Sequence, residues 1–533
     1  MHPRLVIHQL GVLFLGLAGA MGVVAALDAA GLLGVGPGER EAVPALLAGV
    51  ISAALLGGGL WVATRGAERA AFNRKDALLL VACLWLLGAA LAATPYYAWS
   101  LLGGPPPPGP VAGTPFAADK AAPHAFTSFA GCYFEAMSGL STTGATVLGA
   151  APNDIESLPR GLLLWRALTH WLGGLGIVVL FVAVIPVAGM GGKKLFELEA
   201  PSPTNTAVRA RVEETARVLW MLYAGLTLAQ VGALRLAGMP WFDAVCHSLS
   251  VLATGGLSTR NASLGAYYNQ PAIDAITIVF MLLAALNFGL YYRLLHGRFR
   301  AVWTDPELRV FLGVLGVATL VIAFWIWGDP VMLTTGVVVP QESFGGALRD
   351  SLFQVVAIQT GTGFSTVDYE QWPFGPKAVL VALMFFGGMA GSTTGGLKVV
   401  RLMILFKILR AELERKFRPR VVQPIRIGGN VIAPEIVRSV PIYIVMLLLV
   451  LVVASVGIKL LEPADSLTYG SAMSAAISTL MNVGPGVAAV GATDNYGFFG
   501  APSLLVLSLL MALGRLELFA ILVLFSPRFW RER

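Results

Sequence analysis

The sequence predicts an all-α integral membrane protein with ten transmembrane helices and a fourfold pseudo-repeat. Composition is the first reason: of 533 residues, 56% are hydrophobic and only 13% are charged, about half the ~25% charged fraction of soluble globular proteins. Ten long apolar runs are the second reason, because a helix needs ~20 apolar residues to cross a bilayer. The third is a short segment followed by a cluster of Gly, Thr and Ser residues, a pattern that occurs four times.

The apolar runs are spread along the whole chain. They cover residues 5–27, 44–64, 77–99, 161–187, 218–239, 272–296, 309–328, 377–408, 440–462 and 502–525. The first run is too long for the h-region of a signal peptide and a second span follows it, so we expect a retained helix. The composition excludes a secreted toxin, a disordered chain and a cytosolic nucleotide enzyme. Three cysteines without a C-x-x-C pair indicate neither a disulfide framework nor a structural zinc site.

The distribution of charge predicts the topology. Four connections, at 65–76, 188–217, 293–309 and 398–438, together with both tails hold 27 Lys and Arg against 12 Asp and Glu, whereas the opposite connections hold 8 against 16. Cytoplasmic loops carry the excess of Lys and Arg. Both termini are therefore predicted to be cytoplasmic, in a multi-pass protein of the cytoplasmic (inner) membrane. The predicted external face is acidic, which raises the local concentration of cations.

Four external connections share one layout. Each has a semi-apolar segment of about 12 to 15 residues, too short to span a bilayer, before its small-residue cluster. The clusters contain Gly144, Gly255, Gly363 and Gly484, which stand 111, 108 and 121 residues apart. A period this regular marks an internal repeat. The expected units are a two-helix N-terminal extension and four repeats, at residues 1–74, 75–200, 201–305, 306–432 and 433–533.

The clusters suit a cation pathway. Irregular backbone at membrane depth is tolerated only where protein buries it or where it lines a watery path, so we expect four re-entrant pore helices and their loops to converge on one ion pore. Glycine lets a loop turn its carbonyls toward a common centre, and rings of carbonyls replace the hydration shell of alkali cations. The alternative for any single cluster is an ordinary helix-packing surface of small residues. That alternative does not account for four clusters in register.

At these residues the sequence resembles the TrkH/TrkG/KtrB family of potassium transporters, which is related to fungal Trk and plant HKT proteins. The resemblance extends over essentially the whole chain, and the two extra N-terminal spans are TrkH-like. Beyond the four clusters it rests on WRALTHWLGGLG at 165–176, GGMAGSTTGGLK at 387–398 and GRLE at 514–517. The resemblance implies potassium uptake through a glycine-lined selectivity filter.

The resemblance also implies which residues line the filter. They are Thr142, Thr143, Gly144, Thr254, Gly255, Thr362, Gly363, Asn482, Val483 and Gly484. In this family, glycine at all four aligned positions goes with a preference for potassium, so K⁺ is the expected ion. The alternative is a Na⁺ or poorly selective monovalent-cation channel or symporter, because Gly361 of the third loop stands where a hydroxyl residue is expected.

A glycine-rich break divides the run at 377–408. The resemblance identifies it as an intramembrane gating loop below the filter, with the residues Gly387, Gly388, Gly391, Ser392, Thr393, Thr394, Gly395, Gly396 and Lys398. Small residues weaken the helical propensity here and permit a hinge. A phosphate-binding loop is excluded because Leu397 occupies the position of its lysine. The remaining alternative is a tightly packed kink without a gating role.

Arg515 lies in the last predicted span, where ionisable residues are costly and usually functional. The resemblance implies an arginine near the pore that repels cations or times their passage. Glu517 is a candidate partner for it, and a structural ion pair with another helix is the alternative. Neither paired carboxylates nor a nucleophile with an adjacent base are found within the predicted spans, so the chain is not expected to be an enzyme.

The family resemblance also implies partners. A homodimer and a cytosolic TrkA-like regulatory ring that binds nucleotides (ATP/ADP or NAD) are expected. The chain itself is expected to carry K⁺ and to bind no organic cofactor and no nucleic acid. The strongly basic segment from Arg410 to Arg438 is a candidate seat for the ring or for anionic membrane lipids.

Overall fold

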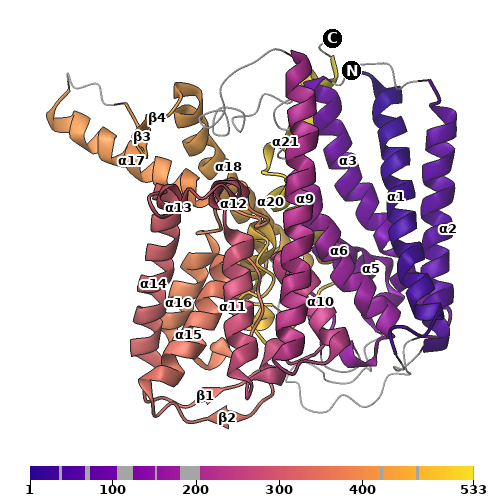
Figure 1. Ribbon diagram of the computed structural model, residues 1–533, viewed down its shortest axis with the longest axis horizontal. Helices are drawn as coiled ribbons and strands as arrows, with labels where there is room; N and C mark the ends of the chain where they lie inside the picture. Colours follow the sequence, from indigo (N-terminus) through magenta and orange to yellow (C-terminus); the bar gives the residue numbers. More distant parts are fainter. Residues whose placement is uncertain are drawn as a thin grey trace.

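A computed structural model shows a mostly helical protein (Figure 1). It describes residues 1–34, 39–66, 73–104, 124–149, 153–179, 205–419, 424–463 and 467–531. The predicted boundary between residues 200 and 201 and Arg420 of the basic segment lie outside these ranges.

The α-helices are α1 (Pro3–Ala29), α2 (Glu39–Ala63), α3 (Arg74–Ala92), α4 (Thr94–Leu101), α5 (Phe129–Ser141), α6 (Arg160–Val179), α9 (Asn205–Leu236), α10 (Trp241–Leu252), α11 (Pro271–Ala285), α12 (Phe288–Leu295), α13 (Phe299–Trp303), α14 (Pro306–Ile326), α15 (Phe344–Gln359), α16 (Phe374–Met384), α17 (Val399–Phe417), α18 (Pro434–Leu461), α19 (Tyr469–Met481), α20 (Ala501–Arg515), α21 (Phe519–Leu522) and α22 (Pro527–Arg531). Two small antiparallel hairpins pair β1 (Val331–Met332) with β2 (Val338–Val339) and β3 (Arg426–Ile427) with β4 (Asn430–Val431). Short 3₁₀ turns occupy Ala125–Thr127, Ile155–Ser157, Ser263–Tyr267, Tyr369–Gln371, Ala488–Val490 and Val523–Phe525.

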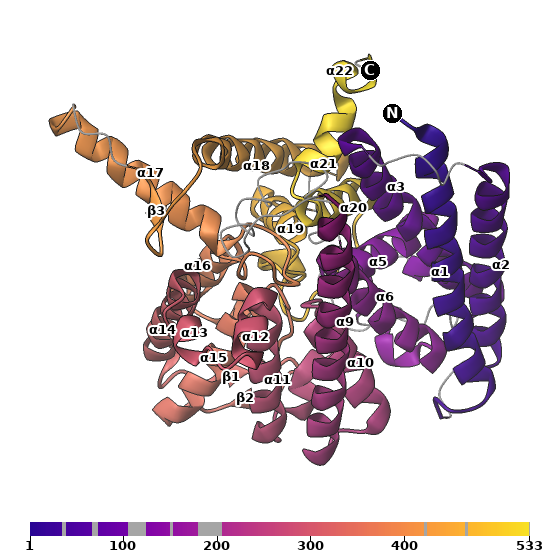
Figure 2. The same ribbon diagram turned by 45° about the horizontal axis from the view of Figure 1, so that its top comes forward.

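The long helices stand side by side, and both termini lie at the same end of the molecule (Figure 1). The α1–α2 pair forms one edge, whereas α14, α15 and α16 form the other. The β1–β2 hairpin lies at the end opposite to the termini. Figure 2 shows α17 projecting away from the bundle on the side of the termini. The basic segment that begins in α17 therefore shares the end of the molecule with both termini.

Six described helical stretches are long and apolar enough to cross a membrane: Pro3–Ala29, Ala42–Ala63, Lys75–Leu101, Ala216–Leu236, Pro306–Ile326 and Pro434–Leu461. A seventh candidate consists of Ala501–Arg515 and Phe519–Phe525, which meet at an angle of 111°. α11 and α16 are apolar but shorter. The chain is thus a multi-pass membrane protein, and the predicted total of ten spans stays a prediction.

Apolar side chains cover the outer faces of these helices. On α18 the exposed residues include Ile442, Val445, Leu449 and Val453, and α14 exposes Phe324. Contiguous apolar surface of this kind is unusual for a soluble protein. It is stable in contact with lipid chains, which agrees with the membrane class predicted from composition.

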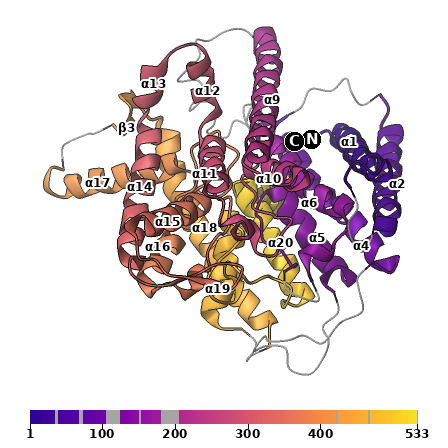
Figure 3. The ribbon, with the colours of Figure 1, turned by 60° about the horizontal axis from the view of Figure 1, so that its bottom comes forward.

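Four short helices, α5, α10, α15 and α19, lie around the middle of the molecule (Figure 3). Each one contacts a helix of the span before it, the helix after it and the helix that follows the preceding short helix. The contacts are α5 with α3, α6 and α20; α10 with α9, α11 and α6; α15 with α14, α16 and α11; and α19 with α18, α20 and α16. The pattern closes on itself because α20, near the end of the chain, packs against α5 near its beginning. It brings the loops after the four short helices together.

Local sequence explains where two of these helices begin. The side chain of Ser343 accepts a hydrogen bond from the Gly346 amide at the start of α15, and Thr468 accepts one from the Ser471 amide, at 3.1 Å, at the start of α19. Such caps satisfy amides that have no partner inside the helix. They fix the starting points of these helices, and the loops at the other ends form the candidate site.

Candidate functional site

All four short helices end with the same backbone turn. A residue with left-handed backbone lies within two residues of each helix end: Thr142 (φ 52°), Thr254 (φ 56°), Gly361 (φ 67°) and Asn482 (φ 54°). The next amide donates to the carbonyl five residues before it, as Thr143 does to Ser138 at 2.9 Å. The equivalent bonds join Gly255 to Ser250, Thr362 to Ala357 and Val483 to Ser478. This Schellman geometry sets the four loops in a common register.

One residue further on, each loop has a glycine with positive φ. These ring glycines are Gly144 (φ 82°), Gly256 (φ 89°), Gly363 (φ 71°) and Gly484 (φ 99°). The alignment by sequence placed Gly255 in this set, and the structure corrects it by one residue to Gly256. Gly255 instead faces α6, where an added Cβ would collide with the imidazole of His170. Only glycine adopts a positive φ without steric cost, so the backbone supports the shifted register.

The ring glycines bring the four loops into contact in chain order. A Cβ added to Gly144 would collide with the carbonyl oxygen of Gly255, and one added to Gly363 would collide with that of Val483. Similarly, a Cβ on Gly256 would meet the carbonyl oxygen of Thr362, and one on Gly484 would lie 2.6 Å from that of Thr143. The first loop therefore abuts the second, the second the third, the third the fourth, and the fourth the first.

A cavity of about 80 Å³ adjoins this ring. Its walls include all four ring glycines and the polar residues Thr146, Ser258, Ser365 and Asp494. Since a single water needs roughly 10–15 Å³ of such space, the cavity is large enough for several waters. The ring thus borders a space that has room for water and is lined by small and polar groups.

Polar side chains brace the fourth loop against its neighbours. The Asn482 amide nitrogen donates to the Thr143 hydroxyl at 2.8 Å and to the Met511 carbonyl at 2.9 Å, which joins the fourth loop to the first and to α20. The Gly484 carbonyl accepts from the Tyr496 hydroxyl at 2.9 Å and from the Ser478 hydroxyl. These bonds hold the backbone of the loop while leaving its glycine at the ring.

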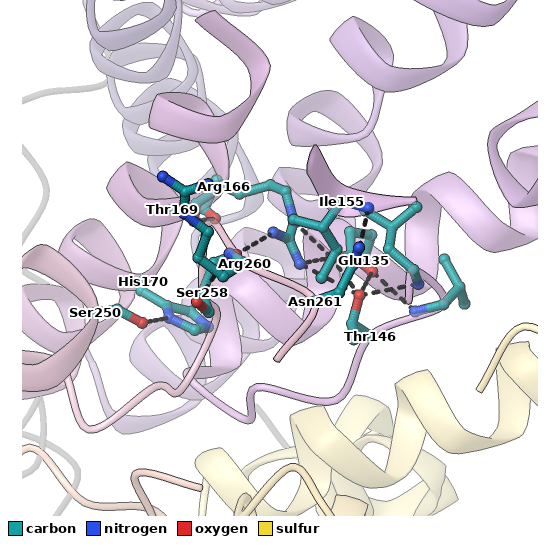
Figure 4. A network of polar contacts seen from close by, with 12 residues as sticks. Glu135, Thr146, Ile155, Arg166, Thr169, His170, Ser250, Ser258, Arg260 and Asn261 are labelled. Carbon is teal, nitrogen blue, oxygen red and sulfur yellow. Dashed lines mark hydrogen bonds and ion pairs between the residues drawn. The ribbon is translucent and has the colours of Figure 1, made fainter. Parts of the chain in front are cut away.

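Arg166 of α6 links the first two loops (Figure 4). Its guanidinium forms an ion pair with Glu135 of α5, with 2.7 Å between Nη2 and Oε1, and donates to the Ser258 carbonyl at 2.9 Å. Glu135 also accepts from the Thr146 hydroxyl at 2.9 Å and from the Val147 amide at 3.1 Å. The sequence predicts a packing or interface role for Arg166 and does not predict its pairing with Glu135. The available signal was the pair of charges inside apolar stretches, since such residues in membrane proteins are usually functional.

His170 lies one helical turn after Arg166 and is completely buried. Its Nδ1 is 2.7 Å from the Ser250 hydroxyl of α10, and Figure 4 shows the two side chains facing each other. The imidazole therefore ties α6 to α10 beside Gly255.

The glycine-rich break, residues 385–398 between α16 and α17, lies against the fourth loop. A Cβ added to Gly395 would meet the Asn482 side chain, and one added to Gly396 would lie 2.6 Å from the Met481 carbonyl oxygen. The Thr393 hydroxyl donates to the carbonyls of Leu252 at 3.2 Å and Ala284 at 3.1 Å. The break is thus packed between the ring and the helices α10 and α11.

The remaining predicted residues of the break are held within it. The hydroxyls of Ser392 and Thr394 lie 2.8 Å apart, and the buried Lys398 donates to the Thr394 hydroxyl at 2.7 Å. Gly387 and Gly388 lie in the first half, where the Gly387 amide donates to the Leu397 carbonyl at 3.0 Å. The second half thus folds back on the first. Gly391 has a positive φ of 72° at the turn between them.

Arg515 reaches this break from the end of α20. The side chain is 2% exposed, and its Nη1 and Nη2 donate to the carbonyls of Thr393 at 2.7 Å and Gly173 at 2.9 Å. Glu517, the candidate partner, instead pairs with Arg401 of α17, with 2.5 Å between Nη2 and Oε2. Within the described residues, Arg515 forms no ion pair and is held by backbone carbonyls. A positive charge therefore lies between the break and α6.

Metal-binding side chains do not gather elsewhere in the part of the chain that the structure describes. No group of three or more His, Cys, Asp or Glu residues there has a geometry that holds a metal ion.

Known proteins share this chain's sequence and fold. A family model described as TrkH, cation transport protein, matches residues 119–532. The chain is 39% identical over 402 residues to the Trk system potassium uptake protein TrkH of Salmonella typhimurium, which covers 75% of this chain and 79% of that protein. It is 32% identical over 484 residues to the Trk system potassium uptake protein TrkG of Escherichia coli K12, which covers 90% of both chains.

A solved structure agrees along the full length. The crystal structure of the potassium transporter TrkH from Vibrio parahaemolyticus matches with a TM-score of 0.81 and 32% sequence identity, and covers 100% of both chains. The match confirms the family predicted from the motifs. It also confirms the prediction that the chain is a transport protein and not an enzyme. The chain belongs to the TrkH family of cation transport proteins.

Proposed function

We propose that this protein takes up potassium ions across the cytoplasmic membrane through one pore formed by its four loops. The closed ring of Gly144, Gly256, Gly363 and Gly484 is the observation that carries the proposal. Rings of backbone carbonyls replace the hydration shell of an alkali cation. Relatives that are 39% and 32% identical are named potassium uptake proteins, which supports K⁺ as the ion.

The proposed filter comprises the equivalent positions of the four loops. They are Thr142, Thr143 and Gly144; Thr254, Gly255 and Gly256; Gly361, Thr362 and Gly363; and Asn482, Val483 and Gly484. Each of these loops follows the C-terminal end of a short helix, and the partial negative charge of that end favours a cation. Geometry and electrostatics therefore both support a cation filter.

The glycine-rich break is proposed to be the gate. It packs against Met481 and Asn482 of the fourth loop, and its Thr393 carbonyl accepts from Arg515. A cation that leaves the ring toward the termini meets the break and the charge of Arg515. Displacement of the break and of this charge is the step that we propose opens the path.

Ten spans, four re-entrant pore helices and a fourfold pseudo-repeat remain our proposal for the architecture. The recurring contacts of α5, α10, α15 and α19 support it, because they follow the same rule in each repeat and close on themselves. We keep the proposed units 1–74, 75–200, 201–305, 306–432 and 433–533. The end with both termini and the basic α17 is proposed to be cytoplasmic, and the β1–β2 end external.

The proposed partners act at the cytoplasmic end. The "Trk system" names of the relatives support a separate regulatory component, which we propose is a TrkA-like nucleotide-binding ring. α17 exposes an apolar stripe of Phe406, Leu409, Leu413 and Phe417, which supports a homodimer contact. Its basic side chains suit anionic lipid head groups. The chain itself is proposed to bind only the transported ion.

Ion flux into proteoliposomes tests the proposal. Purified protein is reconstituted with K⁺, Rb⁺, Na⁺ or Li⁺ gradients, and we expect flux that prefers K⁺. Gly144→Ser places a side chain against the Gly255 carbonyl, so K⁺ preference is expected to fall or disappear. Gly313→Ser is the matched control because a Cβ on Gly313 meets no atom within 4 Å. Absence of any cation flux, with the regulatory ring also added, contradicts the proposal.

A Na⁺ or poorly selective monovalent-cation channel or symporter is the second candidate. Gly361 favours this second candidate. The equivalent residues of the other three loops, Thr142, Thr254 and Asn482, have side chains that a glycine lacks. Equal K⁺ and Na⁺ flux through the wild-type protein supports this candidate. A strong change of the ion ratio in Gly361→Thr would support it further.

A further inference from the structure

The two halves of the glycine-rich break run side by side as a narrow neck. The Gly387 amide donates to the Leu397 carbonyl at 3.0 Å, and the Val399 amide donates to the Gly388 carbonyl at 3.3 Å. These bonds pair the segment that leaves α16 with the segment that enters α17. These two bonds therefore hold the two ends of the break together.

A carboxylate continues this pairing where the backbone bonds stop. Glu307 Oε1 accepts from the Ala390 amide at 2.8 Å and from the Val400 amide at 3.2 Å. One oxygen thus bridges both halves of the neck and replaces the carbonyl of a further backbone pair. Glu307 is 8% exposed and Val400 is 6% exposed, so water is a poor substitute for this oxygen. Charged acceptors make stronger bonds than neutral ones.

Glu307 is held in place by the start of α14. The chain begins this helix at Pro306, and the Asp305 side chain caps it by accepting from the Glu307 amide at 3.0 Å. A carboxylate in the first turn is also stabilised by the helix dipole. Its carboxylate accepts from the Ala390 and Val400 amides and, within the described residues, forms no ion pair. α14 and α17 contact each other, and Figure 1 shows the start of α14 beside the inner end of α17.

The cytoplasmic hairpin contacts the same place. A Cβ added to Gly428, in the turn between β3 and β4, would lie 3.2 Å from Pro306, which directly precedes Glu307. Ile425 and Ile427 of this segment pack in a cluster with Val400 and Ala390, the two residues that donate to Glu307. Any movement of the hairpin relative to α17 therefore changes the geometry at the carboxylate.

The tip of the break has separate anchors. Thr393 is bound to Leu252, Ala284 and Arg515. The tip and the neck are thus held by different helices, α10, α11 and α20 for the tip and α14 for the neck. The tip can therefore be released from its helices without release of the neck, and the neck without release of the tip. Of the two, the neck is the part that lies next to the β3–β4 hairpin.

We propose that Glu307 is a positioning residue that clasps the neck of the break and holds it in the closed position. Displacement of α17 and the β3–β4 hairpin pulls the Val400 amide off the carboxylate, and the unpaired neck lets the break move away from the ring. This inference rests on the proposed function, in which the break lies in the ion path. It adds the residue through which the cytoplasmic segment acts on the break.

Labelling of a cysteine in the break tests the clasp directly. Ser392 is completely buried, so Ser392→Cys is expected to react slowly with a small, membrane-impermeant thiol reagent added from the cytoplasmic side. In Glu307→Ala, the rate is expected to rise roughly tenfold, since a hydrogen bond to a charged group contributes about that factor to the closed state. The same proteins without Ser392→Cys give the blank for the three native cysteines. An unchanged rate in Glu307→Ala overturns the clasp.

Two further variants separate the clasp from a loss of folding. Glu307→Gln keeps an acceptor oxygen without the charge, so an intermediate rate is expected. Glu435→Ala is the matched control, because Glu435 also follows the proline that begins a long helix, α18, but is exposed. Its rate is expected to equal that of the wild type. A rise in Glu435→Ala as large as that in Glu307→Ala would also overturn the proposal.

Potassium flux distinguishes this inference from the proposed function. Glu307→Ala is expected to raise the K⁺ flux of the protein without its regulatory ring roughly tenfold, with unchanged ion preference. Faster labelling without K⁺ flux in any variant supports the clasp and contradicts the potassium pathway. Normal K⁺ flux with equal labelling in wild type and Glu307→Ala overturns the clasp and leaves the pathway intact.

Discussion

Arg166 and Glu135 form a buried ion pair behind the ring, with 2.7 Å between Nη2 and Oε1 and side chains that are 2% and 0% exposed. The pair does not stand alone, because the remaining polar atoms bind Thr146 of the first loop and Ser258 of the second. A buried pair is stable only when such further hydrogen bonds compensate for lost hydration. The pair therefore couples the positions of two loops to each other.

Removal of one partner is expected to destabilise the protein strongly. Arg166→Met leaves the Glu135 carboxylate buried without its cation, and breaking a buried pair costs about 3–5 kcal/mol. The melting temperature of purified protein in detergent measures the loss. We also expect reduced preference for K⁺ over Na⁺ in proteoliposomes, because the first two loops lose their common anchor.

Removal of both charges provides the internal check. The double variant Glu135→Leu with Arg166→Met leaves no uncompensated charge, so part of the lost stability is expected to return. The exposed pair Glu412–Arg415 is the external control, with side chains 53% and 50% exposed, and Arg415→Met is expected to leave the melting temperature unchanged. Equal effects of Arg166→Met and Arg415→Met would contradict the bracing role.

The sequence alone led to the proposal that four loops form the site, because each follows a short segment and carries a small-residue cluster at a regular spacing. It did not determine the register of the second loop. Gly255 and Gly256 are adjacent and identical, so nothing in the local sequence distinguishes the one with positive φ. The distinction comes from tertiary contacts. Gly256 contacts Thr362, which is 106 residues away in the chain, and Gly255 contacts His170, which is 85 residues away.

Sequence patterns also did not predict the polar partners of the break. Glu307 binds backbone amides, which carry no signature in the sequence, and they lie 83 and 93 residues away. Glu517 pairs with Arg401, 116 residues earlier, and not with the nearby Arg515. Residues two apart on a helix face different sides, which disfavours a pair between Glu517 and Arg515 but does not identify Arg401 as the partner. Tertiary contacts decided both cases.

The corrected register predicts different consequences for two adjacent glycines. The three atoms nearest to an alanine Cβ at Gly255 all belong to the imidazole of His170, whereas an alanine at Gly256 meets the Thr362 backbone and requires a positive φ of 89°. We therefore expect His170→Ala to restore K⁺ flux to Gly255→Ala but not to Gly256→Ala. Flux in proteoliposomes measures both pairs, with His170→Ala alone as the reference. Rescue of Gly256→Ala and not of Gly255→Ala would restore the original alignment.

Acid is expected to destabilise the segment before α5 through His124. The side chain is 4% exposed, its Nδ1 accepts from the Phe126 amide at 3.1 Å, and its ring lies 5.6 Å from that of Trp99. Burial lowers the pKa of His124 from 6.5 to about 4. The unfolded chain binds the proton first as pH falls, so stability is complete above about pH 6.5 and declines between pH 6.5 and pH 4.

This loss amounts to about 2 kcal/mol at pH 5. His124→Asn keeps an acceptor for the Phe126 amide without a titrating group, so the melting temperature is expected to fall less between pH 7.5 and pH 5 than in the wild type. His296→Asn, at an exposed histidine, is expected to keep the wild-type pH dependence. The same pH dependence in His124→Asn and the wild type would exclude His124 as the source.

Arg515 is expected to restrain ion flux by its charge and by its hold on the break. Its guanidinium binds the Thr393 carbonyl at 2.7 Å and the Gly173 carbonyl at 2.9 Å. Arg515→Gln removes the charge and shortens the side chain, so K⁺ flux without the regulatory ring is expected to rise severalfold. Arg515→Lys keeps the charge but lacks the two-pronged geometry, so an intermediate rise is expected. Arg528→Gln, at an exposed arginine near the C-terminus, serves as the control and is expected to match the wild type. Because Arg515→Lys differs from Arg515→Gln mainly in charge, equal flux through these two variants would assign the restraint to the hydrogen bonds alone.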